Sequence, residues 1–186
     1  NNSVGIGVVP EAFYSTFSPL RIGDTGGIFN RNDANTLYLS QNMYIESSGS
    51  ANPTYIENDE ASWYQMSAGS HKFHTAAAGT GTISSTQVLD IDSAGHVTMP
   101  LQPAFQAKPS TDQNDIAEGA DVTIIYGTEV FDQNSDFNSN VFTAPVTGKY
   151  QLNSYIRLNN VDTAPAYYQF KIKTSNSTYT VTYDTG

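Results

Sequence analysis

Short stretches in which apolar and polar residues alternate dominate this chain, and they predict β-strands. In residues 167–173, for example, Phe170 and Ile172 fall on one face while the polar residues between and beside them fall on the other. No window repeats apolar side chains at the i, i+3, i+4 and i+7 positions of an amphipathic helix. The pattern therefore predicts an all-β protein.

The first hundred residues consist of short apolar runs separated by Gly, Asn, Asp and Ser. A turn is expected around residues 24–27 and another at 93–95, and the Gly and Ala-rich residues 76–81 are expected to form a loop. The runs predict strands within residues 3–10, 20–29, 36–40, 42–45, 55–56, 61–66, 70–75, 87–92 and 96–99.

A chain of 186 residues can hold one or two domains, and we predict two. Pro100 and Pro103 favour an extended link, so the expected domains are residues 1–100 and 101–186. After the link, the expected strands are residues 105–108, a strand 122–126 buried on both faces, a long strand 149–158, 167–173 and 179–183. Thr147 and Gly148 are expected to form a turn with positive φ before the long strand.

Composition and charge exclude several functions. The chain has no Cys, so it has no disulfides and no thiol chemistry. Its net charge of −10 is shared by both halves and repels phosphate backbones, which argues against nucleic-acid binding. No apolar run approaches the ~18 residues of a membrane span, so no membrane insertion is expected.

A series of aromatic, Pro and Gly positions in the second half matches a known signature. Its order and spacing resemble the jelly-roll heads of the complement-one-q and tumour-necrosis-factor superfamily, from about residue 101 to the end. The resemblance implies a trimeric binding head, here a jelly roll that lacks its last strands. The matching residues are Phe131, Asp132, Phe137, Phe142, Pro145, Gly148 and Tyr150.

The first half resembles the repeat units of phage tail fibres, in particular those of marine phages. Val4-Gly5-Ile6-Gly7 and residues 92–100 are similar to two halves of one recurrent fibre motif, and residues 38–44, 61–65 and 69–76 resemble other repeat units. The resemblance implies a repeat-type β-prism or shaft. Short Gly-rich strands with polar faces are not expected to enclose a large core alone, so we expect an intertwined homotrimer that buries apolar rows between chains.

No metal or cofactor is expected. His71 and His74 are three residues apart on a predicted strand, so they point to opposite faces and cannot share one ion. Residues 90–95 begin like a calcium loop but lack its later acidic ligands. The remaining calcium candidates lie in an acidic stretch for which a solvated loop is the alternative interpretation: Asp112, Asp115, Glu118 and Asp121.

Catalysis is not expected either. The chain has no Gly-x-Ser-x-Gly elbow, and His96 lies in a predicted turn. A pair of carboxylates across a groove, as in glycoside hydrolases, stays open. Four aromatic residues can stack on sugars or, the preferred interpretation, pack at strand or subunit contacts: Trp63, Tyr64, Tyr167 and Tyr168.

These features together favour the structural and receptor-binding part of a phage tail fibre, extracellular in the virion, that attaches to a host surface without catalysis. The expected partners are further copies of the chain, other tail or baseplate proteins, and a host-surface glycan or outer-membrane protein. Two alternatives remain open. One is a capsid decoration fibre or a secreted bacterial adhesin, and the other is a tailspike that degrades polysaccharide.

Overall fold

The computed structural model describes residues 3–47, 51–161 and 164–184. The chain divides into two compact units, Asn1–Val146 and Thr147–Gly186. Strands are the only regular elements among the described residues, so the all-β prediction is confirmed. In this part of the chain there is no helix with the length and apolar character needed to cross a membrane. The domain boundary at residue 100 stays a prediction.

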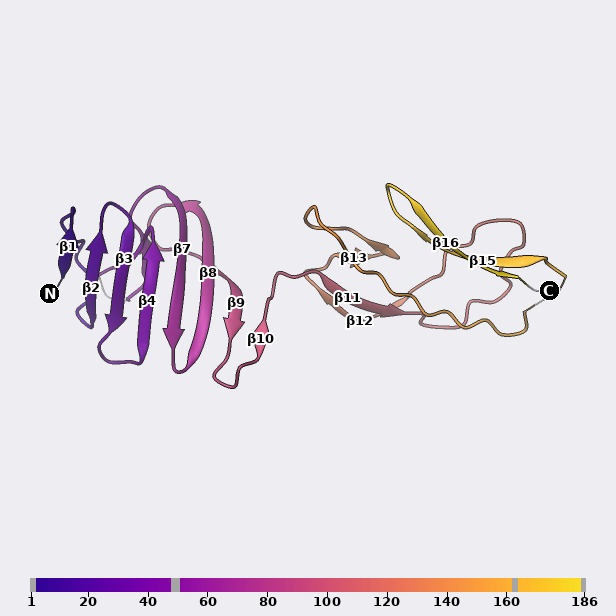
Figure 1. The fold of residues 1–186 in the computed structure, drawn as a ribbon, viewed down its shortest axis with the longest axis horizontal. Helices are drawn as coiled ribbons and strands as arrows, with labels where there is room; N and C mark the ends of the chain where they lie inside the picture. Colours follow the sequence, from indigo (N-terminus) through magenta and orange to yellow (C-terminus); the bar gives the residue numbers. More distant parts are fainter. Residues whose placement is uncertain (1–2, 48–50, 162–163, 185–186) are drawn as a thin grey trace. The chain divides into compact units, whose positions relative to one another are not determined.

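An eight-stranded sheet organises the first unit, with its strands side by side in the order β1-β2-β3-β4-β7-β8-β9-β10 (Figure 1). Neighbouring strands are antiparallel, except that β1 is parallel to β2. The bounds are β1 (Val4–Ile6), β2 (Phe17–Ile22), β3 (Gly26–Arg31), β4 (Thr36–Gln41), β7 (Asp59–Ser67), β8 (Ser70–Gly79), β9 (Thr86–Ile91) and β10 (Val97–Thr98). Each segment predicted as a strand in this sheet contains one, although the strand predicted within residues 3–10 ends at Ile6, and the turn before β3 is confirmed.

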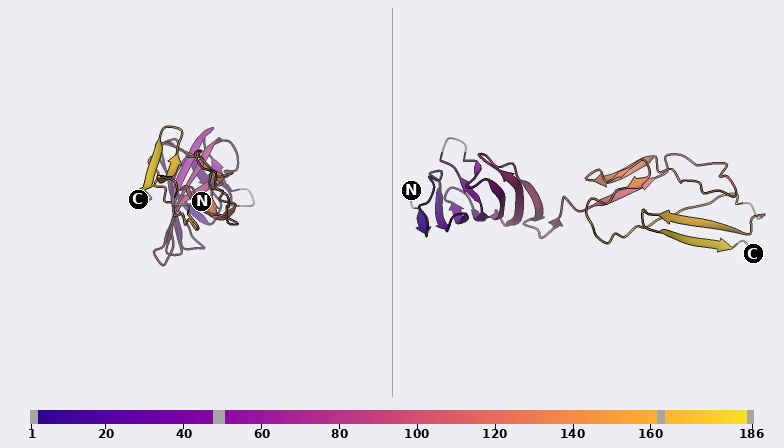
Figure 2. Two further views of the ribbon diagram at one scale, coloured as in Figure 1. Left: turned by 90° about the vertical axis from the view of Figure 1, so that its right-hand side faces the viewer. Right: turned by 90° about the horizontal axis from the view of Figure 1, so that it is seen from above.

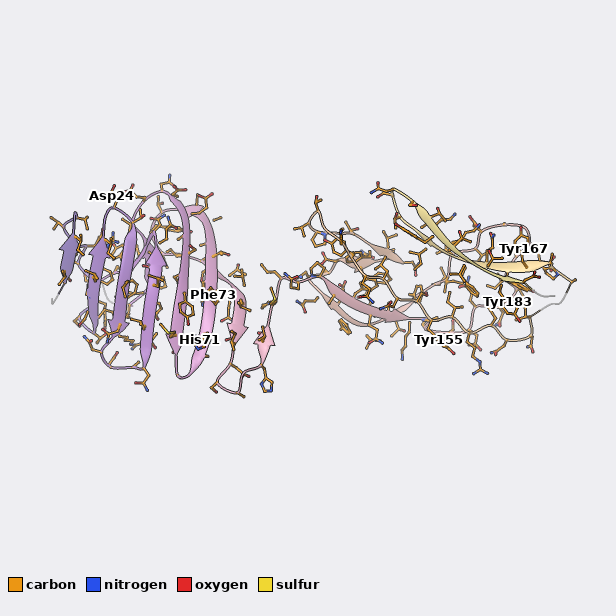
Figure 3. All side chains as sticks on the ribbon, in the orientation of Figure 1. Asp24, His71, Phe73, Tyr155, Tyr167 and Tyr183 are labelled. Carbon is orange, nitrogen blue, oxygen red and sulfur yellow. The ribbon has the colours of Figure 1, made fainter. Side chains whose placement is uncertain are left out.

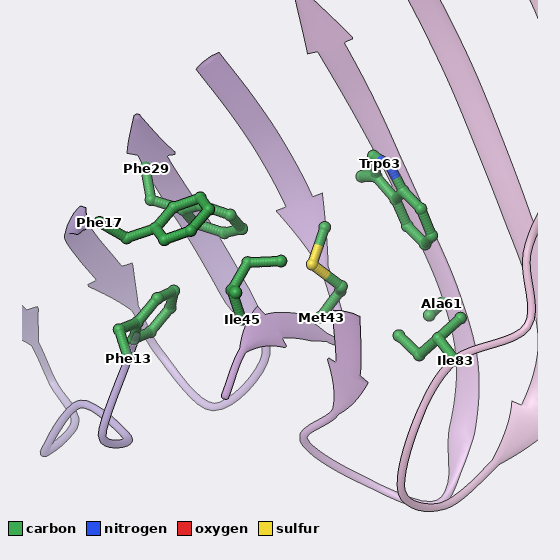
Figure 4. Packing of buried hydrophobic residues seen from close by; sticks show 8 residues of the cluster. All are labelled: Phe13, Phe17, Phe29, Met43, Ile45, Ala61, Trp63 and Ile83. Atoms are coloured by element: carbon green, nitrogen blue, oxygen red, sulfur yellow. The ribbon is translucent and has the colours of Figure 1, made fainter. Parts of the chain in front are cut away.

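One face of this sheet is covered by other parts of the same unit. Strands β5 (Met43–Ile45) and β6 (Pro53–Tyr55) pair with each other, and Met43 and Ile45 belong to the core. The rings of Phe13 and Phe29 meet edge to face with centroids 5.1 Å apart, a favourable aromatic geometry. Figure 4 shows the eight buried side chains of the cluster: Phe13, Phe17, Phe29, Met43, Ile45, Ala61, Trp63 and Ile83. A single chain thus encloses a core, contrary to the sequence-based expectation, but on one face of the sheet only.

A fully buried arginine closes the turn between β2 and β3. The Nε of Arg21 donates to Oε2 of Glu11 at 2.6 Å, and its Nη2 donates to the carbonyl oxygen of Asp24 at 2.8 Å. Its Nη1 donates to the carbonyl oxygen of Gly26. The guanidinium is fully buried, and this carboxylate and these carbonyls are what make its burial tolerable.

Asn42 directs the chain from β4 out of the sheet and onto its covered face. Its φ is 56°, a left-handed conformation that Asn tolerates better than most residues, and its side chain is completely buried. The amide nitrogen Nδ2 donates to the carbonyl oxygens of Glu57, Asp59 and Glu60 at 3.1, 3.0 and 2.9 Å. Oδ1 accepts from the backbone N–H of Glu57 at 2.7 Å. One side chain thus fixes the backbone of residues 57–60, which leads into β7.

The rest of the first unit contains two small antiparallel sheets. Strand β11 (Ala104–Lys108) pairs with β12 (Thr128–Gln133), and β13 (Phe137–Asn138) pairs with β14 (Val141–Phe142). The ring of Phe105 stacks on Phe137 and on Phe142, with centroids 4.7 and 5.1 Å apart. These stacks tie the two small sheets together.

The second unit contains one antiparallel hairpin, β15 (Tyr167–Lys173) and β16 (Thr178–Asp184), drawn in yellow in Figure 2. Both strands were predicted, and the half-exposed character of β15 is confirmed by its alternating burial. The long strand predicted at 149–158 is wrong, because these residues form no strand and Tyr155 lies exposed. Neither Thr147 nor Gly148 takes the positive φ that was expected of the turn.

Two further predictions for the first unit are wrong. Residues 122–126 form no buried strand; the side chain of Gln113 bonds the backbone of Thr123 and Ile125, both at 3.0 Å, in place of a neighbouring strand. Residues 76–79 were expected in a loop, but they extend β8, because β7 begins early enough for Asp59 to pair with Gly79.

Candidate functional site

The uncovered face of the eight-stranded sheet carries a continuous row of apolar side chains. Successive residues of a strand point to opposite faces, so the neighbours of the core residues point away from the core. Each member of the row lies directly opposite the next on the adjacent strand. From β1 to β9 the row, called the central row below, contains Val4, Leu20, Ile28, Leu39, Tyr64, Phe73 and Leu89.

A second row runs beside the first, two residues further along each strand. On β4, β7, β8, β9 and β10 it contains Leu37, Met66, His71, Ile91 and Val97, whereas the corresponding positions on β3 and β2 are the polar Asn30 and Ser18. Tyr64 joins the two rows: its ring stacks on that of Phe73 with centroids 4.8 Å apart, and its hydroxyl is hydrogen-bonded with Nδ1 of His71. Figure 3 shows Phe73 and His71 on β8. We call the two rows together the open face.

The open face is uncharged and well exposed. Neither row contains Asp, Glu, Lys or Arg, although the chain has 18 acidic and eight basic residues. Leu39, at the centre, is 53% exposed and Phe73 is 39% exposed. Leaving such side chains in water forgoes the hydrophobic stabilisation that burial would give them.

The open face has the size of the largest apolar patches found on protein surfaces, which are often functional. The central row spans seven strands, or roughly 30 Å, and the second row spans five strands, or roughly 20 Å; since each row is about 7 Å wide, the two together cover about 350 Å². Standard interfaces bury about 800 Å² on each partner. Monomers rarely leave contiguous apolar patches above a few hundred Å² in contact with water. The open face is smaller than a standard interface, but it has the chemistry of a surface that another apolar surface covers.

The four candidate sugar-stacking aromatics fall in different environments. Trp63 is buried and stacks on His74 with centroids 4.9 Å apart, so it serves in packing, the preferred interpretation, and offers no ring face to a sugar. Tyr64 belongs to the open face. On β15, Tyr167 is exposed, whereas Tyr168 is half-buried opposite Tyr183.

The signature residues of the second half do not form one site. Phe137 is buried and Phe142 half-buried, while Phe131 is exposed. The carboxylate of Asp132 accepts from the backbone N–H groups of Asp136 and Phe137 at 3.1 and 3.0 Å, which fixes the turn between β12 and β13. Pro145 lies in the first unit, but two signature residues belong to the second: Gly148 and Tyr150.

The acidic residues proposed for calcium are not brought together. All four lie exposed between β11 and β12: Asp112, Asp115, Glu118 and Asp121. Among the described residues, no three His, Cys, Asp or Glu side chains are placed so that they could hold one metal ion. The solvated-loop interpretation accounts for this segment.

A hollow of about 460 Å³ lies at β12 and β13. It combines two carboxylates with an exposed aromatic ring, and Asp132 is already engaged by backbone N–H groups. It is lined by Glu129, Phe131, Asp132, Ser135, Phe137 and Asn138.

Sequence reasoning predicted apolar rows between chains but did not identify the residues of the open face. The sequence did indicate this surface, because consecutive residues in β2 to β4 are apolar. Phe29, for example, faces the core, and its neighbour Ile28 faces away from it. No protein-family model, no curated protein and no solved structure matches the chain.

Proposed function

We propose that this chain is a structural and receptor-binding component of a virion fibre, of the phage tail-fibre kind, which attaches to a host surface without catalysis. The open face carries the proposal, because an extended sheet with one face packed and the other apolar suits a shaft built from several chains. The tail-fibre resemblance of residues 1–100 supports the same assignment.

The open face is covered by further copies of the same chain, in a homotrimer. Copies with a net charge of −10 repel one another, so a contact between them needs a surface free of acidic residues, and the two rows provide one. Three sheets arranged around an axis, each with its open face inward, form a β-prism in which the central rows of all copies meet. Closed symmetry leaves no open face uncovered.

A trimeric fibre also suits attachment. Three equivalent receptor sites on one particle raise the overall strength of contacts that are individually weak. In this arrangement the fibre is extracellular, one end joins other tail or baseplate proteins, and the receptor is a host-surface glycan or outer-membrane protein. The same open face would serve a capsid decoration fibre or a secreted adhesin equally well.

The absolute mass in solution, measured by light scattering, tests the proposal. The wild type is expected at three times the 20.2 kDa of one chain. Leu39→Asp, at the centre of the open face, is expected at the mass of one chain, because burying a carboxylate among apolar rows is costly. Val9→Asp is the matched control, since Val9 is exposed outside both rows, and it is expected to remain trimeric. A monomeric or dimeric wild type, or a trimeric Leu39→Asp, would overturn the proposal.

The polysaccharide-degrading tailspike is the second candidate, and the hollow at β12 and β13 is the observation that favours it. Glu129 and Asp132 both line this hollow. Such an enzyme releases oligosaccharides from host envelope, and Glu129→Gln should abolish the release while leaving the mass unchanged. Release that depends on Glu129 would replace the non-catalytic proposal.

A further inference from the structure

The two units of the chain differ sharply in charge. Residues 1–146 contain four basic and sixteen acidic side chains, a net charge of −12, whereas residues 147–186 contain four basic and two acidic side chains, a net charge of +2. The difference in net charge is not apparent when the sequence is divided near residue 100. Half of all basic residues therefore lie in the shorter unit: Lys149, Arg157, Lys171 and Lys173.

Two of these lysines share one face of the β15–β16 hairpin. The register places three pairs on that face, namely Gln169 with Thr182, Lys171 with Thr180 and Lys173 with Thr178. Residues two apart on a strand are about 7 Å apart, so the two ammonium groups can be presented side by side. Both lysines and the three threonines are exposed.

The opposite face of the hairpin is apolar. Its pairs are Tyr168 with Tyr183, Phe170 with Val181 and Ile172 with Tyr179. Its β15 residues are half-buried, whereas Tyr179, Val181 and Tyr183 on β16 are 63%, 68% and 63% exposed. Polar and apolar side chains are thus separated on the two faces of the hairpin.

We infer that the polar face of the β15–β16 hairpin binds an acidic polysaccharide, one that carries carboxylate or phosphate groups. This inference rests on the proposed attachment role and names the class of receptor. Lys171 and Lys173 supply the positive charge, and the threonine hydroxyls and the Gln169 amide can bond sugar hydroxyls. Tyr167, 56% exposed at the start of this face and labelled in Figure 3, offers a ring on which a sugar can stack.

A polysaccharide fits these charges better than a nucleic acid does. Duplex DNA carries about one negative charge per 1.7 Å. Residues 1–146, with a net charge of −12, therefore repel it strongly. An acidic polysaccharide is less densely charged, and its neutral hydroxyls match the threonines. Asp184 is also on this face but lies opposite Tyr167, at the end away from Lys173.

Binding to defined polysaccharides tests the inference. Hyaluronate provides carboxylates, a phosphomannan provides phosphates, and dextran is the uncharged control; each is titrated against the full chain at low and at physiological salt. The wild type is expected to bind at least one acidic polymer, more weakly at high salt. The double variant K171Q/K173Q should weaken binding by about tenfold or more, because it removes two charges from every copy.

The matched control is K149Q/R157Q, which removes the same charge from the same unit outside the hairpin and should leave the affinity within about twofold. An equal loss in both double variants, no binding of either acidic polymer by the wild type, or equally strong binding of DNA would each overturn the inference. Light scattering on the same samples separates the two proposals. A trimer that binds neither polymer contradicts this inference alone, whereas a monomeric wild type contradicts the fibre.

Discussion

The ring of Tyr64 stacks on the ring of Phe73 across β7 and β8, with centroids 4.8 Å apart, on the open face of the sheet. The two residues next to this pair in the chain, Trp63 and His74, stack on each other on the opposite face, with centroids 4.9 Å apart. The same two strands thus present one aromatic stack to the core and one to the proposed trimer interface. Deleting a ring should therefore have different consequences on the two faces.

Phe29→Ala and Phe73→Ala test this difference. Phe29 is 1% exposed in the core, so its truncation should lower the free energy of unfolding by about 3–5 kcal/mol at any protein concentration. Phe73 is 39% exposed, so its truncation should lower the free energy of unfolding of one chain by less. Its main effect should be that the assembly dissociates at a higher protein concentration. Urea unfolding at two concentrations, with light scattering on dilution, measures both effects. Equal and concentration-independent losses would show that the open face supports the fold of one chain instead of an interface.

The local elements of this fold were accessible from sequence because each is encoded in a few neighbouring residues. The alternation in β15 and the Gly-containing turn before β3 are of this kind. The prediction of a strand at 149–158 was wrong because alternating polar and apolar residues show only that a segment can form a strand. The strand also requires backbone hydrogen bonds with a neighbouring strand. Residues 122–126 failed for the same reason, since the amide of Gln113 satisfies backbone groups there.

The open face and the charged hairpin face were harder to predict because both depend on strand register. Leu39 and Tyr64 are 25 positions apart in sequence, and only the pairing of β4 with β7 places them opposite each other. Likewise, the positive charge of residues 147–186 is apparent only after the boundary at 146 is known. Asn42 gave no signal at all, since a single Asn before an apolar run is unremarkable in sequence.

Asn42→Asp should be among the most destabilising single changes in the first unit. The substitution replaces an NH₂ group that donates to three carbonyl oxygens by an oxygen that repels them, in a fully buried position. We expect a loss of about 3 kcal/mol, because three carbonyl oxygens lose their donor and a carboxylate is placed in a fully buried position. Asn35→Asp is the matched control, since residue 35 is exposed in the turn between β3 and β4. Chemical denaturation of both variants measures the difference, and equal stabilities would show that the Asn42 bonds contribute nothing.

The stability of the eight-stranded sheet should fall on mild acidification because of His74. Burial holds the pKa of His74 below its usual value of 6.5, and the nearby charge of Lys72 lowers it further, against the opposing effect of Asp90. The unfolded chain therefore binds this proton more readily than the folded chain does. The stabilisation is fully present above pH 6.5 and is lost as the pH falls through the pKa of the folded state.

His74→Gln should remove this part of the pH dependence, and urea unfolding at pH 7.5, 6.5 and 5.5 measures it. His96→Gln is the control, because His96 is exposed, lies 2.8 Å from the carboxylate of Asp92 and has no contact with the core. That variant should keep the decline below pH 6.5. The stack on Trp63 gives the histidine ring an apolar neighbour that favours its neutral form. A decline that persists unchanged in His74→Gln would instead assign the effect to another group.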